Sequence, residues 1–320
     1  MTGAAGGAAT DLTIPGVSIG HATDVAARTG CTVLIGPFRA ACDVRGFATG
    51  SREMDALSPM HLVPRADALL LTGGSAFGLA AAEGVVGWLE ARGIGFETSA
   101  ARVPIVPAAV IYDLAVGRAD RRPDAAMGRA ACDAAAPWPP SEGAVGAGAG
   151  ATVGKLLGLA GADTGGFGCW AEPAGDFVIG AVAVVNALGD VRDAAGRIIA
   201  GARLPDGRFA DAERVLRGRS DASVAAHFAE PAPTNTTLAV IVTDAPFARD
   251  SLAALARMAA TALARRITPV HTPFDGDIVF ALSTAATPVV TPPQRLLATG
   301  ATAAYALEQA IERAVRRDGA

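Results

Sequence analysis

The chain has 320 residues, a net charge of −4, 51% apolar residues and only 5% aromatic residues. This length allows one large domain or two small ones with a substantial core, in which the many alanines and glycines predict closely approaching backbones. The basic residues are scattered and form no basic stripe, which argues against nucleic acid as a partner.

Short apolar runs predict strands in the first half of the chain. Residues 31–35, 68–72 and 177–185 are rich in leucine and β-branched residues. Each run is almost continuously apolar rather than alternating. This pattern indicates sheets that are covered on both faces.

Helices are predicted between these strands. Residues 75–92 predict a helix with Ser75 as its N-cap and Gly93 as its C-terminal stop. Residues 123–132 predict another helix. The glycine-rich stretch 143–154 predicts a flexible or closely packed loop instead.

The second half of the chain has the same alternation. Residues 220–233 have the composition of an exposed linker, and residues 237–242 then predict a buried strand. A helix over 248–266, a strand over 278–283 and a C-terminal helix over 299–317 follow. The whole pattern predicts the α/β class and shows no internal repeat.

The cysteines and histidines indicate neither a zinc site nor a disulfide framework, because no C-x-x-C spacing occurs and the histidines are isolated. We expect reduced thiols and no metal. The N-terminal residues lack the features of a signal peptide, and no apolar run reaches the roughly 18 residues that span a bilayer. A soluble cytoplasmic protein without a membrane partner is therefore expected.

Two glycine-rich segments resemble known motifs but depart from them. Residues 148–155 suggest a phosphate loop, yet Ala149 disturbs the glycine spacing and Leu156 replaces the Ser or Thr that binds magnesium. The same segment misplaces the third glycine of a dinucleotide-binding fingerprint. Residues 73–78 resemble a nucleophile elbow, but Phe77 stands where glycine is required. Neither site is expected.

Rare residue types point to the chemistry. Lys155 is the only lysine, and Asn186 and Asn235 are the only asparagines. Arginine serves wherever charge alone is needed, so the remaining amine is expected where a compact, deprotonatable group is required. Asparagine is absent from turns and caps, where it is normally common. The alternative is that all three are chance survivors of a compositional drift.

Asn235 and Thr236 lie between the expected linker and the buried strand that follows it. A cut between them would give Thr236 a free α-amine with a reference pKa of about 7.7 to 8. This amine can accept the proton of the threonine hydroxyl near neutral pH. Nucleophile and base would then belong to one residue.

Such a threonine also needs an electrostatic partner, oxyanion donors and groups that hold it in place. Lys155, Asn186 and the carboxylates of Asp275 and Asp277 can supply them. The alternative for Asp275 and Asp277 is an ordinary D-G turn before the strand at 278–283.

These residues resemble a known family, the self-cleaving N-terminal-nucleophile hydrolases of the DmpA type. It includes L-aminopeptidase/D-esterases, β-aminopeptidases and nylon-oligomer hydrolases. The resemblance covers nearly the whole chain and rests on separated segments in the family's order: I-P-G-V-S-I-G-H-A-T-D, D-V-R-G, L-T-G-G-S-A-F-G-L, V-P-I-V-P-A-A-V-I-Y-D-L, G-A-G-A-T-V-G-K, V-V-N-A-L-G-D-V, T-N-T-T-L-A-V-I-V-T-D-A and P-V-H-T-P-F-D-G-D-I-V-F-A-L-S-T.

The resemblance implies that one domain, residues 1–320, cuts itself between Asn235 and Thr236. An α chain would end at Asn235 and a β chain would begin at Thr236, the nucleophile. It further implies that Lys155 lies beside the Thr236 hydroxyl.

The resemblance also assigns the remaining site residues. Asn186 would help to stabilise the oxyanion, and Asp275 and Asp277 would hold Thr236 and assist proton movement. Tyr112 is expected to line the substrate pocket, although an interior tyrosine that donates to a backbone carbonyl is an equal alternative.

The family's aminopeptidases commonly have a serine nucleophile and a serine/glutamate pair downstream. Threonine and an aspartate pair occur here, which resembles the nylon-oligomer hydrolases. The resemblance therefore implies hydrolysis of linear amides, such as 6-aminohexanoate oligomers or small peptides. A self-cleaving acyltransferase of the ornithine acetyltransferase type and a non-enzymatic binding protein remain alternatives.

The implied fold is a four-layer αββα sandwich of the DmpA/ornithine acetyltransferase type, within the α/β (α+β) class. The resemblance further implies a homo-tetramer of cleaved units and a reaction that needs no cofactor.

Overall fold

The structure, a computed structural model, describes residues 12–219 and 235–316. Two sheets are joined by one long strand, β2 (Thr29–Val44). An irregularity near its middle divides β2 into two halves. The first half pairs with β1 (Ser18–Asp24) and β4 (Ala66–Thr72), whereas the second half pairs with β17 (Ile278–Ser283). β2 therefore belongs to both sheets.

One sheet is largely antiparallel, and it runs β11, β12, β15, β17 and the second half of β2. Among the described strands of this sheet, only β15 and β17 pair in parallel. Its remaining strands are β11 (Gly166–Ala174), β12 (Phe177–Asn186) and β15 (Thr236–Thr243). The other sheet adds to β1, β2 and β4 the short strands β7 (Ala108–Val110), β3 (Ser51–Arg52) and β8 (Ala136–Pro137).

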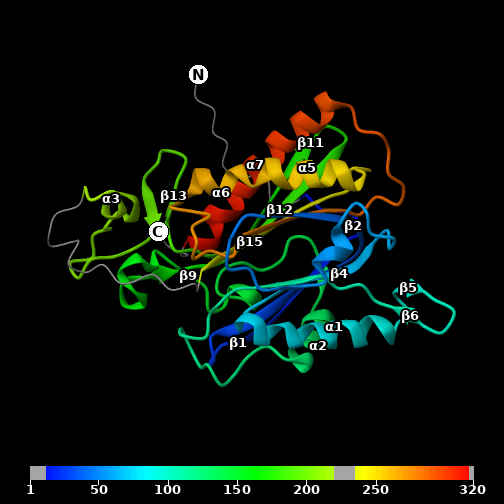
Figure 1. The fold of residues 1–320 in the computed structure, drawn as a ribbon, viewed down its shortest axis with the longest axis horizontal. Helices are drawn as coiled ribbons and strands as arrows, with labels where there is room; N and C mark the ends of the chain where they lie inside the picture. Colours follow the sequence, from blue (N-terminus) through cyan, green and yellow to red (C-terminus); the bar gives the residue numbers. More distant parts are fainter. Residues whose placement is uncertain (1–11, 220–234, 317–320) are drawn as a thin grey trace.

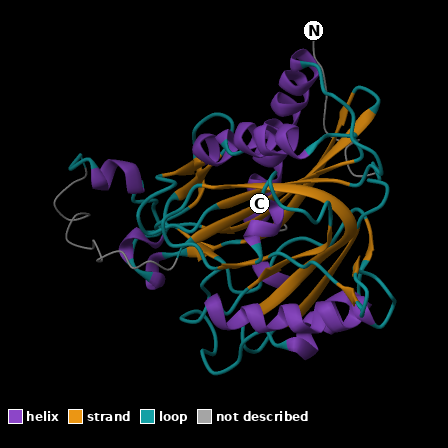
Figure 2. Cartoon of the chain, turned by 45° about the vertical axis from the view of Figure 1, so that its right-hand side comes forward, coloured by secondary structure: helices purple, strands orange, loops and turns teal. Residues whose placement is uncertain are grey.

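Helices cover the outer face of each sheet (Figures 1 and 2). The helices α5 (Arg249–Ala259), α6 (Thr261–Arg266) and α7 (Pro293–Val315) pack on the sheet of β12 and β15. On the other sheet lie α1 (Ala81–Glu90) and α2 (Ala125–Asp133). The architecture is thus helix, sheet, sheet, helix, as the sequence resemblance implies.

Alternation along the strands produces these layers. In β12, Ala181 and Ala183 face the helices, whereas Val182 and Val184 face the other sheet. Both faces are buried, which explains the continuously apolar sequence. The alanines and glycines allow close packing: a Cβ on Gly168 of β11 would lie 2.2 Å from the carbonyl oxygen of Ala310 in α7.

Smaller elements lie around the sandwich. They are the hairpin of β5 (Phe96–Glu97) and β6 (Arg102–Val103), the pair β9 (Thr152–Val153) and β10 (Asp163–Thr164), the set β13 (Asp190–Arg192), β14 (Ile198–Ala200) and β16 (Ile267–Thr268), and the helix α3 (Ala212–Leu216). Within the described residues, no helix is long and apolar enough to cross a membrane.

The predicted strands are all confirmed, but the helices differ in detail. The helix expected over 248–266 is two helices, α5 and α6, which are separated at Ala260. The C-terminal helix begins at Pro293, earlier than expected, since proline is well tolerated in a first helical turn. The linker expected over 220–233 lies outside the described residues.

The prediction that Ser75 caps a helix is wrong. Ser75 is the first residue of a 3-10 helix (Ser75–Ala80) and has a positive φ of 53°, so the N-cap position belongs to Gly74, which has no side chain that could cap it. Gly74 is also left-handed, so the turn after β4 is tighter than the one that a capping serine makes. Gly93, in contrast, has the left-handed conformation expected after a helix.

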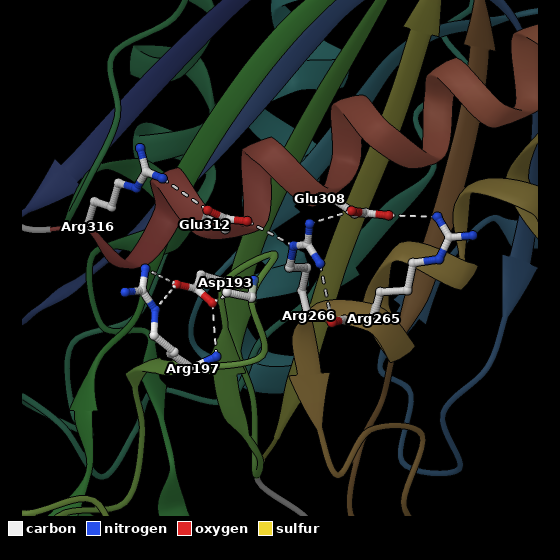
Figure 3. Close-up of polar contacts among 8 residues, drawn as sticks. Asp193, Arg197, Arg265, Arg266, Glu308, Glu312 and Arg316 are labelled. Atoms are coloured by element: carbon white, nitrogen blue, oxygen red, sulfur yellow. Dashed lines mark hydrogen bonds and ion pairs between the residues drawn. The ribbon is translucent and has the colours of Figure 1, made fainter. Parts of the chain in front are cut away.

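A network of charged side chains ties α6 to α7 (Figure 3). Arg266 of α6 is 6% exposed and pairs with Glu308 at 2.5 Å and with Glu312 at 2.9 Å. Arg265 and Arg316 are the outer partners of these two glutamates. Arg266 is therefore the buried centre of the network.

Replacing Arg266 with alanine is expected to lower the free energy of unfolding by about 3–5 kcal/mol, because buried carboxylates lose their central partner. Arg316→Ala is the matched control: this arginine is largely exposed, and its loss is expected to cost at most about 1 kcal/mol. Urea unfolding of both variants tests the expectation, and equal effects would contradict it.

Candidate active site

Thr236 lies at the start of a central strand. It is the first residue of β15 and is buried, with 5% of its surface exposed. β15 pairs antiparallel with β12, and the register sets Thr236 directly opposite Asn186, the last residue of β12. Opposed residues in an antiparallel pair project to the same face, with Cβ atoms about 4.5–5.5 Å apart. Strand register thus brings a hydroxyl and a carboxamide together.

The peptide bond before Thr236 is polarised by two donors. The carbonyl oxygen of Asn235 accepts a hydrogen bond from the Thr236 hydroxyl at 2.6 Å and another from the Gly276 N–H at 2.8 Å. Gly276 can lie there only because it has no side chain: a Cβ would be 2.7 Å from Thr236 Oγ1 and 2.6 Å from the Ala48 carbonyl oxygen. A side-chain hydroxyl and a backbone N–H therefore meet at one carbonyl group.

Lys155 reaches the site from the glycine-rich loop. Gly154 is left-handed, with a φ of 69°, and a Cβ there would lie 2.0 Å from the Ala202 nitrogen. The turn lets Lys155 Nζ donate to Asn186 at Oδ1 (2.8 Å) and at the main-chain oxygen (3.1 Å). Burial lowers the pKa of Lys155 to about 7, against an opposing effect of the Asp275 carboxylate. Near neutral pH this amine can therefore accept a proton.

The Asn186 side chain is held on both sides of its amide. Its Oδ1 accepts from Lys155 Nζ and from the Thr152 N–H at 3.1 Å. Its Nδ2 donates to the Tyr112 carbonyl oxygen at 3.2 Å. A backbone N–H only donates and a carbonyl only accepts, so Thr152 and Tyr112 fix which way the amide points.

Asp275 occupies a buried position beside Lys155. Its Oδ2 accepts from the N–H and the hydroxyl of Thr272 at 2.8 and 2.5 Å. Burial, and next the Asp277 carboxylate, raise the pKa of Asp275, while hydrogen bonds from Thr272 and the Leu188 N–H oppose that rise. The Leu188 carbonyl also accepts from the Lys155 N–H at 3.0 Å. Leu188 thus links the lysine loop to the carboxylate.

Asp277 binds Thr237, the residue that follows Thr236. Its Oδ1 accepts from the Thr237 N–H at 2.7 Å. Its Oδ2 accepts from His271 through Nδ1 at 2.9 Å and through the main-chain N–H at 3.2 Å. The Asp277 carbonyl accepts from the N–H groups of Arg45 and Gly46, after β2. Thr237 and His271 therefore fix the carboxylate of Asp277, and Arg45 and Gly46 fix its main chain.

The structure brings the predicted site residues together from four separate segments: Thr236, Asn235, Lys155, Asn186, Asp275 and Asp277. Tyr112 joins them through its main-chain carbonyl, and its side chain is half-buried. The ordinary D-G turn does not account for Asp275 and Asp277, because their carboxylates hold Thr272, Thr237 and His271.

Sequence reasoning missed several contributors, namely Gly276, Thr152, Leu188, His271 and Thr272. The first three act through main-chain groups, and the residue type does not indicate which partner a main-chain group will bind. His271 and Thr272 stand in the segment H-T-P-F-D-G-D, and their closeness to the two aspartates was the available signal. In the described part of the chain no cluster of His, Cys, Asp and Glu is placed to hold a metal ion. The four cysteines are free.

Comparison with known proteins decides the family. The model of Peptidase family S58 matches residues 8–318. The chain belongs to peptidase family S58. Among curated S58 relatives, an uncharacterised aminopeptidase of Mycobacterium tuberculosis (strain ATCC 25618 / H37Rv) is 41% identical over 303 residues, covering 88% of this chain and 84% of the relative.

A second relative has a defined reaction in its name. The 6-aminohexanoate-oligomer endohydrolase of Agromyces sp. (strain KY5R) is 35% identical over 277 residues, covering 84% of this chain and 73% of the relative. Family membership and these relatives make this S58 chain a hydrolase of the peptidase or amidase type.

Solved structures confirm the fold. The β-aminopeptidase of Burkholderia sp. has a TM-score of 0.68 at 22% identity, and the L-aminopeptidase D-Ala-esterase/amidase of Ochrobactrum anthropi has a TM-score of 0.70 at 20% identity. Each match covers 94% of this S58 chain and 84% of the other chain. The second is a variant of the Ntn-hydrolase fold. The resemblance drawn from the sequence, and the α/β sandwich it implied, are thus confirmed.

Proposed function

We propose that this S58 hydrolase cuts itself between Asn235 and Thr236 and then hydrolyses linear amides with Thr236 as the nucleophile. The observation that carries the proposal is the pair of hydrogen bonds from the Thr236 hydroxyl and the Gly276 N–H to the Asn235 carbonyl. The Thr236 hydroxyl lies beside the peptide bond that would be cut. The Gly276 N–H is placed to stabilise the negative charge that would form on the Asn235 carbonyl oxygen.

Self-cleavage needs a base other than Thr236. Before the cut, the Thr236 nitrogen belongs to a peptide bond and cannot take a proton. Lys155 is the group we assign to this task, because its pKa is lowered to about 7 and it is bonded to Asn186, opposite Thr236. An arginine could not replace it as a base at this pH.

Self-cleavage then proceeds through an ester intermediate. Thr236 Oγ1 attacks the Asn235 carbonyl carbon, its proton passes to Lys155, and Gly276 N–H stabilises the oxyanion. Collapse breaks the C–N bond, the Thr236 nitrogen takes the proton back, and an ester joins Asn235 to Thr236 Oγ1. Water hydrolyses the ester, which leaves a carboxylate on Asn235 and a free amine on Thr236.

Turnover repeats this chemistry on a substrate. The freed amine of Thr236, directly or through a water, takes the hydroxyl proton while Oγ1 attacks a linear amide. An acyl-enzyme forms, the amine product leaves with a proton, and water releases the acid. Asn186 stabilises the substrate oxyanion, Asp275 and Asp277 hold the nucleophile strand, and Tyr112 lines the pocket.

The proposed substrates are 6-aminohexanoate oligomers or the N-terminal residues of small peptides. The name of the Agromyces relative and the threonine and aspartate pattern support the first, and the mycobacterial relative supports the second. We further propose a cytoplasmic homo-tetramer of cleaved units, consistent with the sequence resemblance.

The test is product analysis with purified protein. Incubation with a 6-aminohexanoate oligomer and with a small peptide should release new amine and carboxylate in equal amounts, as measured by mass spectrometry. Adding an acceptor amine such as ornithine should not divert the acyl group. Transfer to the acceptor would support an acyltransferase instead, and no turnover of any linear amide would support a binding protein.

A further inference from the structure

Two adjacent residues hold the two carboxylates of the D-G-D segment. His271 donates to Asp277 Oδ2 through its main-chain N–H (3.2 Å) and through Nδ1 (2.9 Å). Thr272 donates to Asp275 Oδ2 through its main-chain N–H (2.8 Å) and through its hydroxyl (2.5 Å). Each residue thus directs both of its donors to a single carboxylate oxygen. Charge-assisted hydrogen bonds of this kind are the strong ones.

The backbone of His271 is set up for this arrangement. Its φ is 55°, a left-handed conformation that is uncommon for residues other than glycine and in which histidine, asparagine and aspartate are enriched. Such conformations persist where the surroundings enforce them, often at functional sites. The side chain of His271 is 22% exposed, whereas that of Asp277 is 1% exposed. The imidazole therefore covers the buried carboxylate on its outer side.

Both carboxylates act next to the groups that react. Asp277 uses its other oxygen to accept from the Thr237 N–H, which follows the nucleophile in β15. The Asp275 carboxylate raises the pKa of Lys155 against the larger effect of burial. A change in the direction of either carboxylate would therefore move the start of β15 or alter the charge beside Lys155.

We propose that His271 and Thr272 are positioning residues that act on the reaction through Asp277 and Asp275. His271 fixes the carboxylate that holds the start of the nucleophile strand, and Thr272 fixes the carboxylate that faces Lys155. The proposal rests on the proposed function for its kinetic consequences, but the hydrogen bonds of β15 can be measured without activity.

Paired variants separate a lost hydrogen bond from other effects. His271→Ala and Thr272→Val remove the side-chain donors and keep the main-chain N–H groups that bind the same carboxylates. His271→Asn keeps a donor at the place of Nδ1 and tolerates a positive φ, and Thr272→Ser keeps the hydroxyl. His61→Ala is the control for loss of a histidine, because His61 is exposed and lies outside the site.

The alanine and valine variants are expected to slow self-cleavage and to lower kcat about tenfold or more, since a bond to a charged group is lost. KM should change little, because neither side chain is assigned to the substrate. His271→Asn and Thr272→Ser should restore rates close to wild type. Wild-type rates in the alanine and valine variants, or no rescue by asparagine and serine, would overturn the proposal.

Hydrogen exchange provides the readout that does not depend on catalysis. In a Thr236→Ala background, which keeps the chain uncut, His271→Ala should speed exchange of the Thr237 N–H about tenfold, and His271→Asn should restore its protection. Mass spectrometry of peptides that span Thr237 measures this. If the protein proves inactive, the proposed function fails, whereas unchanged exchange in His271→Ala would sink the positioning role itself.

Discussion

Replacing Thr236 with alanine is expected to leave the 320-residue chain uncut and to reduce amide hydrolysis by at least about 10⁴-fold. The alanine has no hydroxyl to attack the Asn235 carbonyl, and the uncut chain has no free amine at position 236. Loss of a nucleophile typically lowers kcat by factors of this order or more. Denaturing gel electrophoresis and the linear-amide assay measure the two effects.

Two controls make this result specific. Thr236→Ser keeps a hydroxyl, so it should still cut itself and turn over substrate. Thr237→Val changes the neighbouring side chain, whose buried hydroxyl has no hydrogen-bond partner among the described residues, and it keeps the N–H that binds Asp277. It should cut itself like wild type. A processed and active Thr236→Ala variant would refute the assignment of the nucleophile.

Replacing Lys155 with arginine is expected to reduce self-cleavage by about 10²–10⁴-fold, the usual contribution of a general base. Arginine keeps the positive charge but stays protonated, and its planar group is larger than an ammonium. Lys155→Met should be equally deficient, because it removes the base without adding charge. Timed conversion of the full-length chain measures the rate. Wild-type cleavage in the arginine variant would show that charge, rather than proton transfer, is what Lys155 supplies.

The pH dependence follows from the same lysine. With a pKa of about 7, Lys155 is neutral above that pH, so self-cleavage should rise with pH and level off above about 7. The free energy of unfolding should also rise with pH. The folded pKa lies below the unfolded value of 10.5, so the unfolded state binds more protons between these pH values and stability rises with pH. Lys155→Met should remove this contribution and be more stable than wild type near pH 7.

The sequence predicted which side chains form the site, but it did not predict the main-chain hydrogen bonds within the site. The rarity of Lys155, Asn186 and Asn235 marked residues that the fold does bring together with Asp275 and Asp277. The carbonyl of Asn235 and its donor Gly276 could not be anticipated in the same way, because main-chain groups acquire their partners only through strand register. The sequence pattern tests His271 only as a metal ligand, so it does not predict the hydrogen bond of His271 to Asp277.

The fold shows the same division. The buried strands were predicted because both faces are apolar, whereas the passage of β2 between two sheets depends on tertiary pairing. No glycine or proline marks the end of α5 at Ala259, and only Ala260 separates it from the start of α6 at Thr261. The two prolines at 292–293 were a signal for the start of α7. The expected start at residue 299 was too late because it rested on the apolar pattern alone.

The intact mass of freshly purified wild-type protein, measured under denaturing conditions, tests the central claim most directly. The account predicts two species, residues 1–235 and 236–320, whose masses sum to that of the full chain plus one water. A single stable species with the full-length mass would contradict it, because Thr236 would then never gain the free amine that the proposed turnover requires.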